Sequence, residues 1–196
     1  MKSIKVFSIL LSICIFLYFP DYIQAQIKLY SFAELVNSSE FVVKGKVKNI
    51  NCYEEKNGYI SSEIKFQISE VLKGENILNK ELKFTFLGGT IGNRTTTVLE
   101  LPHFNKNSES ILFLNRISDN PNDYSLYRIT GLIQGKFDIK TDDYNGKIVV
   151  RDTYMSSNIS IGRGNNSQEI NHKNPIALST FLESLQMLLK SKGAKK

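Results

Sequence analysis

Residues 41–72 alternate apolar and polar side chains with a period of two, and this alternation restricts the fold more than any other feature of the chain. The apolar positions are mostly β-branched or aromatic, as is typical of a half-buried strand. Asn57-Gly58 divides the run, and both residues tolerate the positive φ of a tight hairpin turn. The pattern predicts two antiparallel strands, 41–52 and 59–72. Their shared apolar face comprises Phe41, Val43, Gly45, Val47, Ile60, Ile64, Phe66 and Ile68.

The apolar parity shifts near the end of the second strand, since Val71 rather than Glu70 carries the apolar group. We therefore expect a β-bulge near Ser69-Glu70. Residues 111–114 are apolar at both parities, which predicts a central strand covered on each face. The polar segment 90–97 is expected to be a loop. Further strands are predicted at 82–86, 98–99, 124–129, 132–139 and 147–151.

Two helices are expected at the ends of this β region. Ser31 to Glu34 matches a capping box, which predicts a helix of about two turns. Near the C-terminus, apolar residues recur at helical spacing behind a second capping box, Thr180 to Glu183. The lysines lie in the tail 190–196 rather than along the polar face, which favours docking on the protein's own barrel over a membrane surface. The apolar stripe comprises Phe181, Leu182, Leu185, Leu188 and Leu189.

Short strands, tight turns, a bulge and two flanking helices together predict a mainly β fold, a small closed or half-closed antiparallel barrel. A β-sandwich is the nearest alternative. Of the 196 residues, 41% are hydrophobic and 22% charged, which excludes a collagen-like chain, a long coiled coil and a wholly disordered one. One folded domain is expected at this length.

The first 25 residues resemble a secretory signal peptide in their layout. Lys2 and Lys5 precede an apolar stretch, 6–19, that Pro20 ends, and Ala25 is a small residue suited to cleavage. An uncleaved membrane anchor is the alternative, although the stretch is shorter than a span of about 20 residues. We expect export, to the periplasm or the medium, with no transmembrane span after processing. The expected divisions are 1–25 signal, 26–155 β domain, 156–174 polar linker, and 175–196 helix and basic tail.

Cleavage before Gln26 would remove Cys14 and leave Cys52 as the single cysteine. An intramolecular disulfide or a multi-cysteine zinc site is then impossible, and a quiet, partly buried thiol is expected. Asp142 to Gly146 carries several oxygen ligands, but position twelve of a calcium loop would be Thr153 rather than Glu. A hairpin turn explains this segment better, and no metal or cofactor is expected.

The motifs of the common enzyme classes are absent: neither a Gly-x-Ser-x-Gly elbow nor a His-Glu-x-x-His helix occurs. No residue is predicted to be catalytic. A hydrolase that uses His103 is the alternative from another class, and it requires a carboxylate and a hydroxyl within hydrogen-bond reach of the imidazole.

Two groups of residues are candidates for ligand binding. The first is the glycine-rich segment that includes Gly88, Gly89, Gly92, Asn93 and Arg94, in which the backbone can approach a ligand closely and a guanidinium can bind a carboxylate. The simpler interpretation is that the glycines only turn the chain between two strands. His103 follows in the next loop and is a further candidate.

The second group is the lysine row of Lys44, Lys46 and Lys48, which alternation places on one strand face as an anion-binding stripe. The simpler interpretation is a solvated face that discourages edge pairing. The formal net charge of +6 is modest, no aromatic residues interleave with the lysines, and export removes nucleic acid from reach. The expected partner of this monomer is a protein or polysaccharide in the cell envelope or outside.

Four segments in order resemble a group of uncharacterised exported bacterial proteins. They are Ser39 to Val47, Glu70 to Gly74, Gly88-Gly89 and Ile111 to Leu114, in the pattern S-E-x-V-V-x-G-x-V, V-L-K-G, G-G and L-F-L. Some such segments accompany matrixin-type metalloprotease domains. More distantly, the order resembles the netrin module and the tissue inhibitors of metalloproteases, which implies an OB-like (netrin-like) barrel over about residues 32–138.

The resemblance implies a fold rather than a mechanism. Those inhibitors bind the protease zinc with a disulfide-tied N-terminal cysteine, whereas Gln26 is the expected N-terminus here and no partner cysteine exists. No functional residue is carried over. The sequence therefore predicts an exported, non-enzymatic binding module, with an inhibitor or accessory of an extracellular metalloprotease as the alternative.

Overall fold

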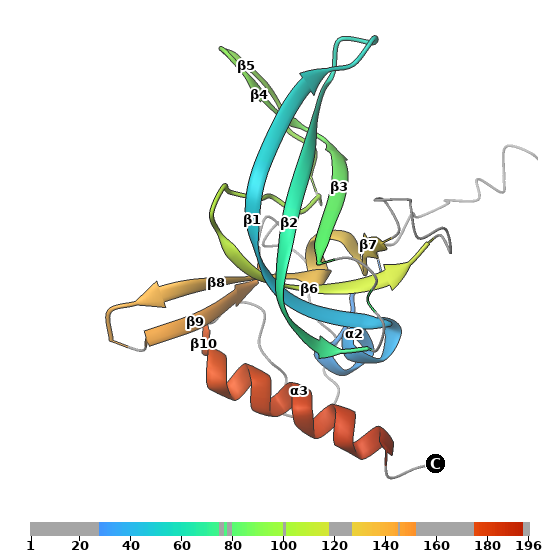
Figure 1. Ribbon diagram of the computed structural model, residues 1–196, viewed down its shortest axis with the longest axis vertical. Coiled ribbons are helices and arrows are strands. Elements are labelled where there is room, and N and C mark those ends of the chain that lie inside the picture. Colours follow the sequence, from blue (N-terminus) through green and yellow to red (C-terminus); the bar gives the residue numbers. More distant parts are fainter. Residues whose placement is uncertain are drawn as a thin grey trace, which may run out of the picture.

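The computed structural model describes residues 28–74, 77, 80–99, 101–117, 127–144, 146–151 and 175–193. The expected signal peptide, its cleavage site and the polar linker 156–174 lie outside these residues. The described chain is mainly β, with antiparallel strand pairing and two α-helices, as the sequence indicates (Figure 1).

The longest element is the hairpin of β1 (Phe41–Glu54) and β2 (Ile60–Lys73), which confirms the alternating pattern. Its turn is closed by a hydrogen bond from the Gly58 amide to the Glu55 carbonyl, 2.9 Å, and Gly58 has φ +84°. Gly45 lies on the apolar face of the hairpin for a packing reason. A Cβ there would lie 2.5 Å from the ring of Phe66, so the missing side chain makes room for that ring.

The expected bulge is present on β2. Lys44 pairs with Glu70 while Gly45 pairs with Ile68, which leaves Ser69 as the extra residue. The parity argument for Val71 is nevertheless wrong, because its side chain is exposed while that of Leu72 packs against the core. A second irregularity lies between Val42 and Val43 and leaves Leu72 as an extra residue, whose side chain packs on the helix-side face of the sheet.

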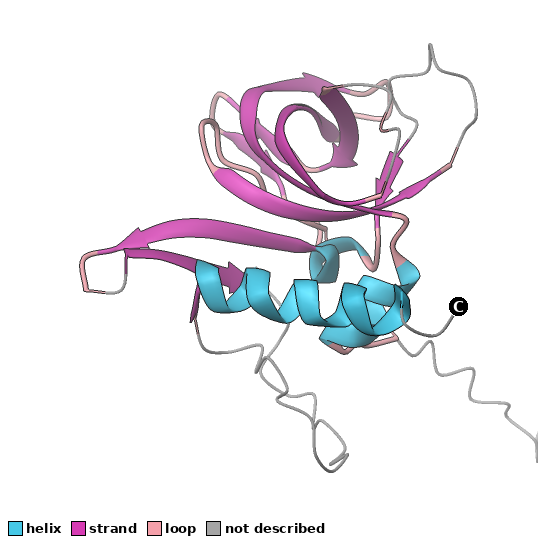
Figure 2. Ribbon diagram, turned by 60° about the horizontal axis from the view of Figure 1, so that its bottom comes forward, coloured by secondary structure: helices cyan, strands magenta, loops and turns pink. Residues whose placement is uncertain are grey.

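Eight strands form one sheet in the order β10-β9-β8-β6-β1-β2-β3, with β7 added on β6. The sheet curls strongly at the β1–β2–β3 end (Figure 2). Pairing among the described residues forms a path with two ends rather than a closed ring, and a sandwich of two large sheets is not formed. The other strands are β3 (Glu81–Leu87), β6 (Glu109–Arg116), β7 (Tyr127–Ile129), β8 (Lys136–Asp142), β9 (Gly146–Arg151) and β10 (Ile176–Ala177).

Three predicted stretches differ from the structure. The segment 90–97 is not a plain loop, because β4 (Gly89–Ile91) and β5 (Arg94–Thr96) pair as a small separate hairpin. The expected strand 98–99 is absent, because no described residue between β5 and β6 lies in a strand and Leu99 is in a turn. The expected strand 132–139 begins instead with a 3-10 helix, η1 (Leu132–Gly135). Gly131 and Leu132 both have positive φ, which breaks the extended backbone before β8.

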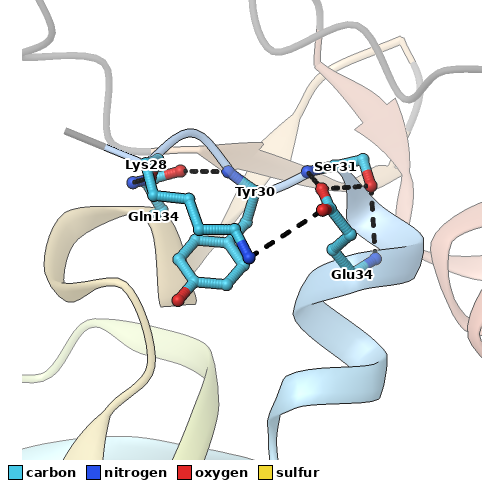
Figure 3. Close-up of polar contacts among 5 residues, drawn as sticks. All are labelled: Lys28, Tyr30, Ser31, Glu34 and Gln134. Atoms are coloured by element: carbon cyan, nitrogen blue, oxygen red, sulfur yellow. Dashed lines mark hydrogen bonds and ion pairs between the residues drawn. The ribbon is translucent and has the colours of Figure 1, made fainter. Parts of the chain in front are cut away.

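The first helix, α2 (Phe32–Ser38), carries the predicted capping box. The Ser31 amide donates to the Glu34 carboxylate at 2.9 Å and the Glu34 amide donates to Ser31 Oγ at 3.2 Å (Figure 3). Next to it, Gln134 of η1 ties down the segment that precedes α2: its Oε1 accepts from the Tyr30 amide and its Nε2 donates to the Lys28 carbonyl.

The C-terminal helix, α3 (Leu178–Gly193), packs on the protein's own sheet, as its apolar stripe indicates. Phe181 and Leu185 are buried, and Leu182, Leu188 and Leu189 are partly buried against the same cluster. The predicted capping box at Thr180 is wrong, because the helix begins two residues earlier and Thr180 lies within its first turn. No helix in the described part of the chain is long and apolar enough to cross a membrane.

Apolar side chains form two cores, one on each face of β1 and β6. The helix-side core lies between the sheet and the two helices, and the curl-side core lies inside the curled strands β1, β2, β3, β6 and β7. Residues 111–114 of β6 alternate between them, which confirms the predicted central strand. Members of the helix-side core include Val42, Ile111, Phe113, Phe137, Phe181 and Leu185, and those of the curl-side core include Val43, Phe66, Leu82, Phe84, Leu112 and Leu114.

Candidate binding pocket

A pocket of about 330 Å³ opens from the curl-side core at the end of the molecule where the β1–β2 hairpin and the β4–β5 hairpin lie (Figure 1). Its floor is formed by Ile50 and Ile64, which belong to or pack against that core. The volume is at the small end of the range for small-ligand sites. The remaining lining residues are Cys52, Ser62, Phe86, Leu87, Gly88, Gly89, Thr90, Thr95, Thr96, Thr97, Val98, Leu101, Pro102, His103 and Phe104.

Gly88 and Gly89 form one wall, where the chain passes from β3 into β4. Their φ angles are +120° and +141°, a backbone conformation that favours glycine. The Ser62 hydroxyl donates to the Gly88 carbonyl at 2.6 Å, and Cys52 Sγ lies 3.3 Å from Ser62 Oγ. A Cβ on Gly89 would collide with Ser62 Oγ and would lie 2.9 Å from Cys52 Sγ. The glycine pair is therefore required for the close approach of this loop to β1 and β2.

Two phenylalanine rings form a second wall. Phe86 and Phe104 line the pocket, and with Phe84 they stack nearly parallel at centroid distances of 6.0–6.4 Å. Lys136 lies over the Phe104 ring at 5.2 Å with its side chain 1% exposed. Its ammonium contacts the Asp138 carboxylate at 2.6 Å, and Ser110 Oγ donates to the same carboxylate at 2.8 Å. The buried charge of Lys136 is thus paired with a carboxylate, and its ammonium lies over the Phe104 ring.

The structure separates the glycine-rich candidates. Gly88, Gly89 and His103 come together in the pocket, whereas Gly92, Asn93 and Arg94 lie at the β4–β5 turn and do not line it. Arg94 already binds a carboxylate of its own chain: it makes two hydrogen bonds to Glu54, each 3.0 Å, and one to the Gly58 carbonyl. The hydrogen bonds from Arg94 hold the pKa of Glu54 below its ordinary value. The guanidinium fork therefore fixes one hairpin against the other.

The lysine row is not a uniform stripe, and none of its residues lines the pocket. Lys44 lies between two carboxylates, 3.7 Å from Glu70 and 3.6 Å from Glu109. Lys46 and Lys48 are exposed, and Lys48 is the extra residue of a bulge between Val47 and Asn49. The pairing of Lys44 and the bulge at Lys48 interrupt the regular row that alternation predicts.

Several pocket residues were not predicted. Cys52 and Ser62 face the glycine pair from β1 and β2, and Thr95–Thr97 come from a segment expected to be a loop. The one available signal was the pairing register, which places Cys52 opposite Ser62 in the hairpin. Nothing in the sequence links either residue to positions 88–104.

Several motif residues outside the Gly-Gly pair lie where the end of α2 meets the hairpin. The Lys73 ammonium donates to the carbonyls of Val36 and Ser39 at the end of α2. Ser39 Oγ hydrogen-bonds the Leu35 carbonyl at 2.8 Å. Gly74 has φ +94°, and a Cβ there would lie 2.5 Å from the Phe41 ring. These segments join the helix end to the hairpin, so their role is structural.

The lining favours an uncharged ligand. Of the described residues that line the pocket, none is Asp, Glu, Lys or Arg, and Cys52 and His103 supply its titratable groups. Within the described ranges, no three His, Cys, Asp or Glu side chains group as a metal site. At Asp142 the carboxylate accepts from the Tyr144 amide at 3.1 Å, as in the predicted hairpin turn.

Comparisons with known proteins find no matching family model, no similar curated protein and no similar solved structure.

Proposed function

We propose that this protein is an exported, non-enzymatic binding module whose ligand site is the pocket at the end of the curled sheet. The observation that carries the proposal is the lining itself. It brings Gly88, Gly89 and His103 together with apolar and hydroxyl side chains, and its described residues include no carboxylate to activate a nucleophile. A small cavity with an apolar floor and few polar groups is the usual form of a ligand site.

The curled strands are proposed to be a small OB-like, netrin-like barrel. In support, five strands surround the curl-side core, and β3 approaches β7 on the side where pairing among the described residues is open. OB-folds bind ligands with a strand face and the loops at one end, and the pocket lies at such an end.

Export rests on residues 1–25, whose charged start, apolar stretch and Ala25 suit a signal peptidase. Mass spectrometry of the periplasmic and secreted fractions tests this part. The expected product begins at or near Gln26, and a membrane-bound product that retains Met1 to Phe19 contradicts it.

A hydrolase is the second candidate, because the pocket brings His103 into one cavity with the Cys52 thiol and the Ser62 hydroxyl. Its required carboxylate is not among the described lining residues. Turnover of p-nitrophenyl acetate by the native protein and by His103→Ala separates the two candidates. A binding module gives the same background rate for both, whereas a rate that falls at least about tenfold in His103→Ala favours the hydrolase.

The binding proposal is tested with fractions of the producing cell's envelope, separated into protein, polysaccharide and lipid. Amide chemical shifts of Gly88, Gly89 and Thr96 report binding in the pocket. The variant Val98→Trp places a large ring at a lining position, and Leu99→Trp places the same ring on the adjacent, exposed residue that does not line it. We expect one fraction to shift these amides in the native protein and in Leu99→Trp but not in Val98→Trp. If no fraction shifts them, or if Val98→Trp responds as the native protein does, the proposal fails.

A further inference from the structure

The rim of the pocket is unusually apolar for a surface. Leu87 is 41% exposed and Ile91 39%, and both lie on the chain that forms the glycine wall or its continuation. Exposed apolar side chains that gather around a cavity are typical of sites that bind another protein, where aromatic residues are enriched.

The polar groups of the pocket wall are already engaged with one another. The Ser62 hydroxyl hydrogen is donated to the Gly88 carbonyl, and Ser62 Oγ also lies within reach of Cys52 Sγ. The hydroxyls of Thr90 and Thr95 lie 3.0 Å apart across the β4–β5 pair, and Thr96 Oγ1 accepts from the Ile60 amide at 3.4 Å. A sugar ring needs hydrogen-bond donors and acceptors from the pocket wall. Most of the hydrogen bonds that these hydroxyl groups can make are already formed within the protein.

Two charged side chains on the hairpins beside the pocket also pair with each other. Glu54 at the end of β1 and Arg94 at the start of β5 form a bidentate pair, so neither presents a free charge to a ligand. Together with the uncharged lining, this pairing favours an uncharged ligand group over an acidic or basic one.

We propose that the pocket binds a single uncharged apolar side chain, of the leucine or phenylalanine kind, which a protein partner inserts between the Phe86–Phe104 wall and the Gly88-Gly89 wall. The apolar rim then contacts the backbone and side chains that flank the inserted residue. An anchor residue in a desolvated pocket is how protein interfaces concentrate their affinity. This inference rests on the proposed function and specifies its ligand.

The test uses the full chain, labelled with ¹⁵N, and defined probes: N-acetyl-leucinamide, N-acetyl-serinamide, N-acetylglucosamine and phosphatidylcholine vesicles. We expect N-acetyl-leucinamide to shift the amides of Gly88, Gly89 and Thr96 at a concentration at least about tenfold below that of N-acetyl-serinamide, because burial of a leucine side chain favours binding by that factor or more. The shifts are expected to persist in Leu99→Trp and to disappear in Val98→Trp. Thr97→Trp, at a second lining position, serves where Val98→Trp does not fold.

Equal responses to the leucine and serine probes overturn the inference. So does a pocket response to N-acetylglucosamine or to the vesicles without one to N-acetyl-leucinamide, although that result leaves the pocket as a binding site. The two proposals are thus distinguished, because the envelope fractions test whether the pocket binds at all and the defined probes test what it binds.

Discussion

The two faces of β1 and β6 use similar residues to build different structures. On the helix side, Phe32, Phe113, Phe137 and Phe181 meet edge-on or tilted at centroid distances of 5.0–6.3 Å, and α2 and α3 cover them. On the curl side, Phe84, Phe86 and Phe104 stack nearly parallel, and Phe86 and Phe104 border a cavity. Helices α2 and α3 therefore close the helix-side core, whereas the glycine-rich loop leaves the curl-side core open at one end.

The largest expected effect comes from breaking the closed face. Leu185→Asp places a carboxylate in the helix-side core, where Leu185 is 1% exposed. We expect the free energy of unfolding to fall by more than about 4 kcal/mol, since both a cavity and an unpaired buried charge result. Thermal and urea unfolding measure the change. The control, Met187→Asp, alters a 70% exposed position of the same helix and is expected to cost less than about 1 kcal/mol.

An unchanged melting temperature for Leu185→Asp, with loss of binding to a partner or to vesicles, would show that α3 is an interaction element rather than part of the closed core.

Next in size is the link between α2 and the hairpin. Lys73→Met removes the ammonium group that donates hydrogen bonds to the Val36 and Ser39 carbonyls, so both carbonyls lose these hydrogen bonds. We expect a loss of about 2–3 kcal/mol in unfolding free energy, as for buried hydrogen bonds to a charged group. Lys46→Met, at an exposed position of β1, is the control and should be near neutral. Equal stabilities of the two variants would contradict a structural role for the V-L-K-G segment.

On the open face, two glycines with positive φ form a matched pair. Gly89→Ala brings a Cβ against Ser62 and Cys52, whereas at Gly92 a Cβ meets nothing within 4 Å. Both substitutions carry backbone strain, which is greater at the φ of +141° of Gly89 than at the φ of +56° of Gly92, so their difference combines this strain with the close approach of the glycine wall. We expect Gly89→Ala to have a free energy of unfolding about 1–2 kcal/mol lower than that of Gly92→Ala. Indistinguishable urea midpoints would mean that the wall can move away.

The smallest expected effect concerns the ion pair near the rim. The pKa of the Glu54 carboxyl is lowered by hydrogen bonds from Arg94, so the carboxylate is favoured in the folded state. The stabilisation that results is present above the ordinary glutamate pKa and is lost as the pH falls through the lower folded value. An NMR titration of Glu54 should return to the ordinary glutamate range in Arg94→Gln. A midpoint that does not move would show that the pair is not formed in solution.

The sequence predicted the elements whose cause is local. The alternation of β1 and β2, the Ser31 capping box and the Ser69 bulge depend on neighbouring residues, and all three are present. Where the prediction failed, a distant contact decides the conformation. Gln134, expected in a strand, instead binds backbone groups at Lys28 and Tyr30, more than a hundred residues away.

The same distinction holds for the candidate site. Gly88 and Gly89 have the positive φ that glycines favour, and together with His103 they line the pocket. The pairing of Arg94 with Glu54 was not predicted, because Glu54 lies forty residues earlier and only the contact of two hairpins brings the two side chains together. Cys52 and the threonines became pocket residues through the same tertiary arrangement.

The reactivity of single thiols tests most directly whether one face is open and the other closed. In a Cys14→Ser background, Cys52 lies in the pocket wall, and Val36→Cys with Cys52→Ser places the thiol in the helix-side core. N-ethylmaleimide should alkylate native Cys52 at least about a hundredfold faster than the thiol introduced by Val36→Cys. The buried thiol reacts only when the protein unfolds, and unfolding costs several kcal/mol of free energy. Val98→Trp should slow the Cys52 reaction, and Leu99→Trp should not. Equal protection of both thiols, with reaction of each only upon global unfolding, would contradict the open pocket on which this account rests.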